Sequence, residues 1–207
     1  RTPCRVLLAE HAVRCVVRRG LGMADVLGAW DVDRAQLDAR RALDASFEHR
    51  SRDAVVELHV TALDLYEPGK AYVFGLASLP DRTAILSLSR LEGDEPGQEA
   101  ERLRTLVRHE FGHAVGLDHH DVEDCVMRQD PTVASLDEAP EGPCVACLRG
   151  LERRLQALGR PGQTALDRAR GLLVRERRDE ARQTLVAALR SHPPDTELLD
   201  AFGRLFH

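Results

Sequence analysis

Apolar residues recur at every third or fourth position through much of the second half of the chain, the spacing of one helix face. This pattern predicts a long helix from about Glu99, with apolar positions at Ala100, Leu103, Leu106, Val107, Phe111, Ala114 and Val115. It predicts four more helices, over residues 144–158, 163–174, 179–190 and 196–206. Pro161, Gly162 and Pro193 separate some of these helices because both residue types disfavour helix interiors.

Short apolar runs predict strands in the first half of the chain. The β-branched run at residues 54–66 predicts a buried strand that ends near Asp64, followed by a loop at 67–70. Residues 72–77 and 84–89 predict two further strands joined by a turn.

Two other segments of the first half carry weaker patterns. Residues 5–17 predict one or two short strands, although a helix is an alternative there. The spacing over residues 33–50 predicts an amphipathic surface helix packed on a sheet. Cys4 and Cys15 are expected to be free thiols rather than metal ligands, and His59 a core or flanking histidine.

Together these elements predict an α/β (α+β) fold, in which a small mixed β-sheet packs with helices and an all-helical extension follows. We expect two domains, at residues 1–160 and 161–207. A length of 207 residues suits one medium domain with a small appendage.

Composition narrows the class of protein further. Hydrophobic residues make up 43% of the chain and aromatic residues only 4%, so the core must rely on Leu, Val and Ala. A net charge of −5 gives no general attraction to nucleic acid, and no apolar run approaches the length that spans a membrane. The start at Arg1 suggests a trimmed or processed N-terminus. Five cysteines, an odd number, favour a reducing compartment over a disulfide framework, so we expect a cytoplasmic protein. We also expect a monomer.

One stretch carries the chemistry, because residues 109–119 read H-E-x-x-H-x-x-G-x-x-H. On a helix, residues four apart lie on one face, so His109 and His113 can bind one ion. Glu110 is placed to act as a base, and Gly116 lets the chain turn so that His119 can supply a third ligand. Three ligands leave one position open, as a catalytic zinc site requires. Surface histidines on an ordinary amphipathic helix are the alternative.

A second group of candidate ligands follows this motif. His120 comes directly after His119, and Cys125, Cys144 and Cys147 follow within a short span. The C-x-x-C spacing at the last two positions is typical of half of a structural zinc site. Reduced core thiols are the alternative interpretation.

These motifs resemble the archaemetzincin family of zinc metalloproteases over roughly residues 5 to 158. The resemblance rests on the zinc motif with its downstream cysteines and on the segments Asp64-Leu65-Tyr66, Tyr72-Val73-Phe74-Gly75 and Ser87-x-Ser89-Arg90-Leu91. It implies a metzincin-like fold built around a long active-site helix, and a zinc-dependent peptidase that acts on peptide or protein substrates.

The resemblance also implies roles for single residues. It implies that the catalytic zinc ligands are His109, His113 and His119, that Glu110 is the general base, and that Met127 is the methionine in the turn beneath the metal.

One further role departs from the family pattern. The family places a cysteine after the third histidine as a ligand of a second, structural zinc, and here that position is His120. The other three ligands match Cys125, Cys144 and Cys147, and the spacer before Cys144 is one residue shorter than in the family. A Cys3His set is a standard structural zinc site, so we expect two Zn²⁺ ions, one catalytic and one structural.

The extension resembles a different family. Residues 167–206 are similar to one tetratricopeptide repeat with part of a second. So short an array cannot form a solenoid by itself, and we expect it to pack on the catalytic domain or on a partner chain.

The sequence leaves two functions open. The first is a zinc metallopeptidase in which Glu110 assists the attack of a water that zinc activates, and in which the strand around Gly75 holds an extended peptide by its backbone. That stretch could equally be plain sheet core. The second is a zinc-stabilised peptide-binding or scaffold module with little or no proteolytic activity.

Overall fold

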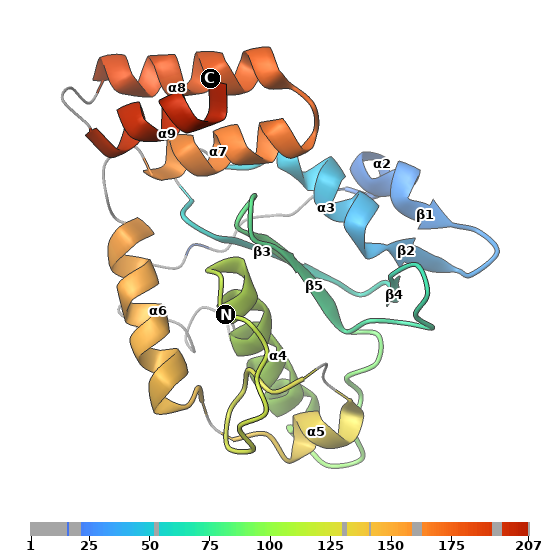
Figure 1. The fold of residues 1–207 in the computed structure, drawn as a ribbon. Coiled ribbons are helices and arrows are strands. Elements are labelled where there is room, and N and C mark those ends of the chain that lie inside the picture. Colours follow the sequence, from blue (N-terminus) through green and yellow to red (C-terminus); the bar gives the residue numbers. More distant parts are fainter. Residues whose placement is uncertain are drawn as a thin grey trace.

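The computed structural model describes Val16 and residues 22–51, 54–129, 132–140, 142–158, 163–191 and 196–206. The strands predicted over residues 5–17 lie outside these residues except for Val16, as do Cys4 and Cys15. The described part of the chain forms two small sheets surrounded by helices, with a group of helices at one end (Figure 1). This architecture confirms the predicted α/β (α+β) class.

The first sheet joins three short strands in the order β1-β2-β4. Strand β1 (Trp30–Asp31) pairs antiparallel with β2 (Gln36–Asp38), and β2 pairs parallel with β4 (Leu65–Tyr66). The short helices α2 (Met23–Val26) and η1 (Leu27–Ala29) precede it.

The second sheet has the order β3-β6-β5. Strand β6 (Thr83–Ser87) lies in the middle and is buried along its whole length. Strand β3 (Glu57–Thr61) runs parallel to it, and β5 (Gly75–Ser78) runs antiparallel on the other side. Among the described strands β5 pairs only with β6, so its second edge faces away from the sheet.

Helix α4 (Gln98–Ala114) packs across β5 and β6 and carries the predicted metal motif in its second half (Figure 1). Glu99 and Glu101 in its first turn complement the positive end of the helix dipole. Helices α5 (Val133–Asp137) and α6 (Val145–Leu158) complete this half of the molecule. Their shared core is made mainly of Leu and Val with two phenylalanines, and its fully buried members include Leu86, Leu91, Leu106, Val107, Val115 and Met127.

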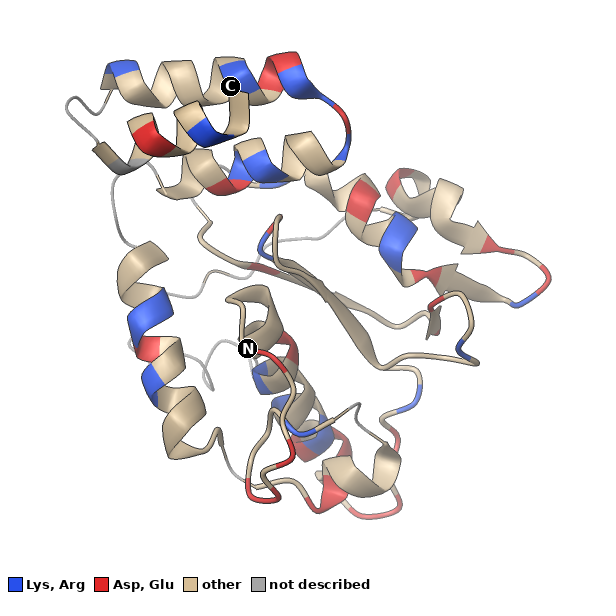
Figure 2. Cartoon of the chain, in the orientation of Figure 1, with Lys and Arg blue, Asp and Glu red and all other residues tan. Residues whose placement is uncertain are grey.

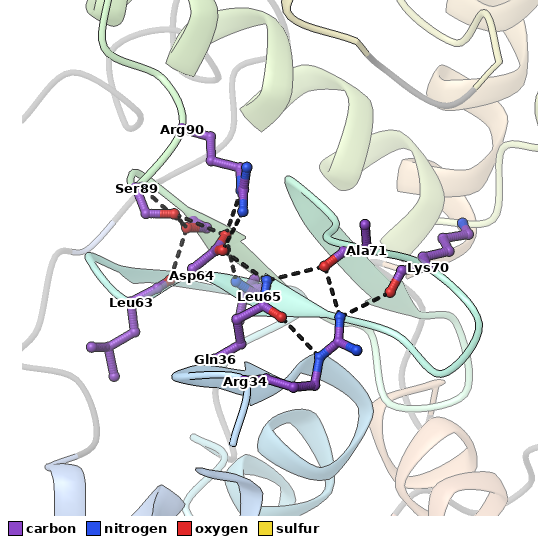
Figure 3. Close-up of polar contacts among 10 residues, drawn as sticks. Arg34, Gln36, Leu63, Asp64, Leu65, Lys70, Ala71, Ser89 and Arg90 are labelled. Carbon is purple, nitrogen blue, oxygen red and sulfur yellow. Dashed lines mark hydrogen bonds and ion pairs between the residues drawn. The ribbon is translucent and has the colours of Figure 1, made fainter. Parts of the chain in front are cut away.

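Asp64 joins the two sheets (Figure 3). Its carboxylate accepts hydrogen bonds from Gln36 Nε2 on β2 at 2.7 Å and from Arg90 Nε and Nη2 at 2.8 and 2.7 Å. Ser89 Oγ adds a fourth bond at 3.1 Å, and the Arg90 guanidinium also stacks on Tyr72. The segments that carry the archaemetzincin resemblance away from the metal motif therefore meet in one network.

The C-terminal extension, residues 163–206, forms three helices: α7 (Gln163–Val174), α8 (Arg178–Ser191) and α9 (Thr196–Phe206). They share their own core, which also includes Phe47 of α3 (Ala39–Phe47), a side chain with no exposed surface. The extension therefore packs on the rest of this chain, which was one of the two arrangements expected from the sequence. Its resemblance to a tetratricopeptide repeat and the division at residue 160 stay predictions.

Two predicted elements of the first half are wrong in part. The helix predicted over 33–50 begins only at Ala39, because Gln36–Asp38 form β2 and the Asp38 carboxylate caps the helix by accepting from two backbone amides. The single buried strand predicted over 54–66 is two strands, β3 and β4, and β3 is only half-buried. His59 lies in β3 and is half-buried, as expected of a flanking histidine, but its buried Nε2 has no hydrogen-bond partner among the described residues.

Smaller differences concern segment ends. The strand predicted over 72–77 is β5 at 75–78, preceded by a single bridge from Val73 to Leu65. Between the predicted long helix and the helix predicted over 144–158, the structure adds the short helix α5, which Thr132 caps. The remaining predicted helices match α6 to α9 within one or two residues.

Within the described part of the chain, no helix is long and apolar enough to cross a membrane. Figure 2 shows acidic and basic residues interspersed along the helices, while the two longer strands at the centre carry little charge.

Candidate metal centre

Three imidazoles converge where α4 ends. His109 Nε2 lies 3.1 Å from His113 Nε2 and 3.2 Å from His119 Nε2, and the last two atoms are 2.9 Å apart. His109 is buried, His113 is half-buried and His119 is exposed, so the group opens to solvent on one side. An ion placed there can therefore be reached by a substrate.

The spacing of the three nitrogens fits zinc. Tetrahedral zinc with nitrogen ligands at about 2.0–2.1 Å holds those nitrogens about 3.3–3.4 Å apart. The observed separations of 2.9 to 3.2 Å are slightly tighter. Three such ligands would leave one of the four positions of a bound zinc ion for water or substrate.

Backbone carbonyls orient two of the rings. His109 Nδ1 donates to the carbonyl of Val126 and His113 Nδ1 to the carbonyl of Leu117, both at 2.8 Å. A carbonyl can only accept, so each bond fixes the proton on Nδ1 and leaves the Nε2 lone pair for a metal.

The turn after α4 depends on Gly116. Its φ of 95° lies in the left-handed region, where a residue with a Cβ is strained. The Gly116 amide donates to the carbonyl of His113 at 2.9 Å, and the Leu117 amide donates to the carbonyl of Gly112 at 2.8 Å. These bonds close the helix end and redirect the chain toward His119.

Glu110 lies beside the imidazoles and against β5. It is 4% exposed, and its Oε1 lies 2.5 Å from where a Cβ on Gly75 would stand. Glycine at position 75 therefore lets the backbone of β5 approach the carboxylate closely. The sequence left two interpretations of this strand open, an edge that holds a peptide or plain sheet core, and the structure brings Gly75 into contact with the predicted base.

Met127 lies beneath the same segment of α4. Its thioether occupies the space where a Cβ on Gly112 would stand, one residue before His113. Met127 is 1% exposed and belongs to the main core. The thioether therefore packs on the core side of the α4 segment that carries His113, and the role of Met127 in a turn beneath the metal stays a prediction.

A second group lies next to the first. His120 Nε2 is 3.1 Å from Cys125 Sγ, 3.0 Å from Cys147 Sγ and 3.7 Å from Cys144 Sγ. The four ligand atoms all lie within 4.8 Å of one another. Cys125 and Cys147 are buried, so this group is more enclosed than the first, as a four-ligand structural site requires.

The thiols of this group need a cation if they are to ionise together. Burial, with the neighbouring Cys125, raises the pKa of Cys147 to about 12. The pKa of Cys144 is lowered, mainly by a backbone hydrogen bond from Cys147. A bound zinc ion offsets the cost of placing thiolates close together, so the donor set fits zinc.

The two groups share a short stretch of backbone. His119 and His120 are adjacent, and the His120 amide donates to the Met127 carbonyl at 3.2 Å. Val126, whose carbonyl orients His109, lies between Cys125 and Met127. The ligand positions in the three-histidine group therefore depend on the same backbone segment that holds the ligands of the second group.

All seven candidate ligands identified in the sequence fall into these two groups, four in one and three in the other. The sequence did not identify the carbonyls of Val126 and Leu117, because a backbone acceptor leaves no residue-type signal. It also missed Leu79 and Arg154, whose side chains lie against Gly116. Asp118 is exposed, as expected of a loop position.

Comparison with known proteins gives matches to one peptidase family. Residues 26–153 match the model of peptidase family M54. The chain is 32% identical over 154 residues to the archaemetzincin of Pyrococcus horikoshii, covering 71% of this chain and 82% of that protein. It is 33% identical over 155 residues to the archaemetzincin of Methanopyrus kandleri, covering 75% and 78%.

Solved structures give the same result. The crystal structure of the Methanopyrus kandleri archaemetzincin aligns with a TM-score of 0.58 at 33% identity, over 63% of this chain and 72% of that one. The archaemetzincin of Archaeoglobus fulgidus, crystallised with malonate, aligns with a TM-score of 0.60 at 27% identity, over 71% and 90%. The family-model match ends before α7, so the extension lies outside it.

Proposed function

The chain belongs to peptidase family M54 and is a zinc metallopeptidase, and on that premise we propose how its residues divide the work. His109, His113 and His119 hold the catalytic zinc, and Glu110 is the general base. The observation that carries this proposal is the convergence of three Nε2 atoms within 3.2 Å of one another, beside a buried carboxylate.

The chemistry follows from these positions. A zinc ion bound by the three imidazoles would polarise the scissile carbonyl and lower the pKa of water. Glu110 takes a proton from the attacking water and later delivers it to the leaving amine. Its buried position beside β5 keeps the carboxylate close to where the peptide bond must lie.

Strand β5 supplies the binding surface for the peptide in this proposal. Its outer edge makes no ladder bonds to another described strand, so it can pair with an extended peptide through backbone hydrogen bonds. Gly75 lies against Glu110, which places the edge beside the proposed base. A peptide paired along β5 therefore runs past the proposed metal.

His120, Cys125, Cys144 and Cys147 hold a second, structural zinc in this proposal. All four ligand positions come from the protein, which leaves no site for substrate. The site ties the segment after α4 to the start of α6. It thereby fixes Val126 and Met127, which contact the proposed catalytic segment.

A peptide library incubated with the zinc-loaded protein and read by mass spectrometry tests the catalytic proposal. Wild type should cleave peptides, and Glu110→Ala should lose about 10²- to 10⁴-fold in rate, since it lacks the base. The variant should keep its zinc, which metal analysis checks.

Removing the metal with a chelator should abolish cleavage, and adding zinc should restore it. Undiminished cleavage by Glu110→Ala would reject the proposed base. Binding of peptides without cleavage at full zinc occupancy would support the alternative, a peptide-binding or scaffold module.

A further inference from the structure

The C-terminal extension contacts the turn that follows β5, the strand proposed to hold the substrate. We infer that the extension positions this strand, and that Asp167 and Arg175 are its positioning residues. The inference rests on the proposed role of β5. It assigns a function to the helices that lie outside the matched family region.

Arg175, the residue directly after α7, binds the turn between β5 and β6. Its Nη1 and Nη2 donate to the two carboxylate oxygens of Asp81 at 2.9 and 3.1 Å. Asp81 is 3% exposed and also accepts from Ser78 Oγ, the last residue of β5, at 2.7 Å. The end of the strand is thus bonded through one carboxylate to the extension.

A second ion pair holds the next residue of the turn. Arg82 donates through Nε and Nη2 to the carboxylate of Asp167 on α7, and Asp167 is 3% exposed. The φ of Arg82 is 51°, in the left-handed region that a residue with a Cβ rarely adopts. The contact with α7 therefore stabilises an unfavourable backbone conformation at the point where β5 turns into β6.

The backbone of α7 approaches the turn closely. A Cβ on Gly171 would overlap Asp81 Oδ1 and would lie 2.8 Å from Cε2 of Phe47. The Arg175 guanidinium stacks on the same Phe47 ring, 4.1 Å from its centroid. The extension, α3 and the turn therefore form one buried contact.

The same turn also contacts the segment that carries the proposed zinc ligands. Leu79, the first residue after β5, has Cδ1 3.1 Å from where a Cβ on Gly116 would stand. At the other end of the strand, Gly75 lies against Glu110. Both ends of β5 are thus in contact with the segment from Glu110 to Gly116, and the extension holds one of them.

The ion pairs between the extension and the turn are better suited to fixing the position of the turn than to holding the two parts together. Buried ion pairs lose much of their Coulombic gain to desolvation, so apolar residues of similar volume would often bind the two parts as well. Ion pairs with two hydrogen bonds instead restrict geometry. Two such pairs on consecutive residues fix the backbone at Asp81 and Arg82.

Arg175→Gln tests the inference, with Arg177→Gln as the matched control. Arg177 pairs with Glu48, so it joins the extension to the end of α3 without contacting the turn. Arg175→Gln should raise KM for extended peptides about three- to tenfold, with kcat and zinc content unchanged, since it loosens the binding strand rather than the base. Arg177→Gln should leave KM unchanged.

Hydrogen exchange provides a readout independent of catalysis. The amides of residues 75–82 should exchange faster in Arg175→Gln than in wild type or in Arg177→Gln. Wild type that cleaves no peptide would reject the proposed function, and the exchange rates alone would then decide whether the extension holds β5.

Unchanged KM and exchange in a folded, zinc-loaded Arg175→Gln protein would overturn the inference. Loss of zinc or of kcat in parallel with KM would overturn it as well, because the contact would then be generally structural. Should Arg175→Gln not fold, Asp167→Asn is read in the same way, with Asp167→Glu expected to restore KM.

Discussion

Two glycines near the proposed catalytic zinc leave space for a neighbouring side chain. Gly75 and Gly112 are the two positions where a side chain would enter space held by Glu110 or Met127. Neither needs the left-handed conformation, unlike Gly116. Instead, the missing Cβ lets the backbone at each glycine approach the side chain of Glu110 or Met127. The sequence shows only that the residue is glycine, not which side chain lies against it.

Gly75→Ala should therefore impair catalysis without loss of metal. The added methyl group would lie 2.5 to 2.8 Å from three atoms of the Glu110 side chain, so the carboxylate must move. We expect kcat to fall by about tenfold or more, because small displacements of a catalytic group are costly.

Steady-state kinetics and metal analysis check this prediction, with Gly28→Ala as the control. Apart from its chain neighbours, no described residue has an atom within 4 Å of a Cβ at Gly28, so that variant should match wild type. Full activity of Gly75→Ala would show that β5 does not constrain Glu110.

The candidate ligands were predictable at this scale because they cluster in sequence. Helical periodicity places His109 and His113 together, and the glycine turn brings His119 to them. His120, Cys125, Cys144 and Cys147 were identified from spacing and resemblance. The carbonyls that orient His109 and His113 were not, since any residue can supply them.

At the scale of elements, helices were predicted better than strands. Helix α4 has seventeen residues with a regular apolar face, and its pattern survives in the structure. Strands β1, β2 and β4 have two or three residues each, too few for any periodicity. Gln36–Asp38 were assigned to a helix because their helix neighbour is strongly amphipathic and their pairing with β4 is a long-range contact.

Asp64 is the residue through which these short strands are joined. Burial alone would raise the pKa of its carboxyl, but hydrogen bonds from Arg90, Gln36 and Ser89 lower it below the usual 3.8. A lowered pKa means that the unfolded chain binds the proton more readily. The stabilisation is therefore present above pH 3.8 and is lost as the pH falls through the lower folded-state pKa.

Asp64→Asn should lower the free energy of unfolding by about 1–2 kcal/mol at pH 7, since it loses charged hydrogen bonds that are partly exposed. The difference from wild type should shrink as the pH falls below 3.8 and through the lower folded-state pKa, because wild type loses the charge there as well. Denaturant unfolding at a series of pH values measures both effects.

Asp200→Asn serves as the control, because Asp200 forms an exposed ion pair with Arg204 on α9. It should change the unfolding free energy by less than about 0.5 kcal/mol at any pH. A difference for Asp64→Asn that stays constant with pH would contradict the assigned charge state.

At the scale of the whole molecule, the sequence predicted the helices of the extension but not where they dock. The contact depends on Phe47, Asp81 and Arg82, which lie about eighty or more positions before their partners in the chain. Nothing in the local pattern pairs Arg82 with Asp167 among so many charged residues. The close fit at Gly171 likewise depends on the assembled structure.

The molecule also joins two proposed metal sites through one short segment. His119 and His120 point to different groups, and Val126 lies beside a ligand of one group and orients a ligand of the other. In the proposed arrangement, two adjacent histidines therefore serve two different zinc ions. His119→Ala and His120→Ala separate them, since each removes one ligand from one group only.

Native mass spectrometry of the zinc-loaded protein, with peptide cleavage measured on the same samples, tests this claim most directly. Wild type should bind two zinc ions. His119→Ala should lose cleavage and the catalytic ion but keep the structural one, and His120→Ala should lose the structural ion and some stability but still cleave peptides. A folded wild type with one zinc, or a His120→Ala protein that keeps both ions and loses only activity, would contradict it.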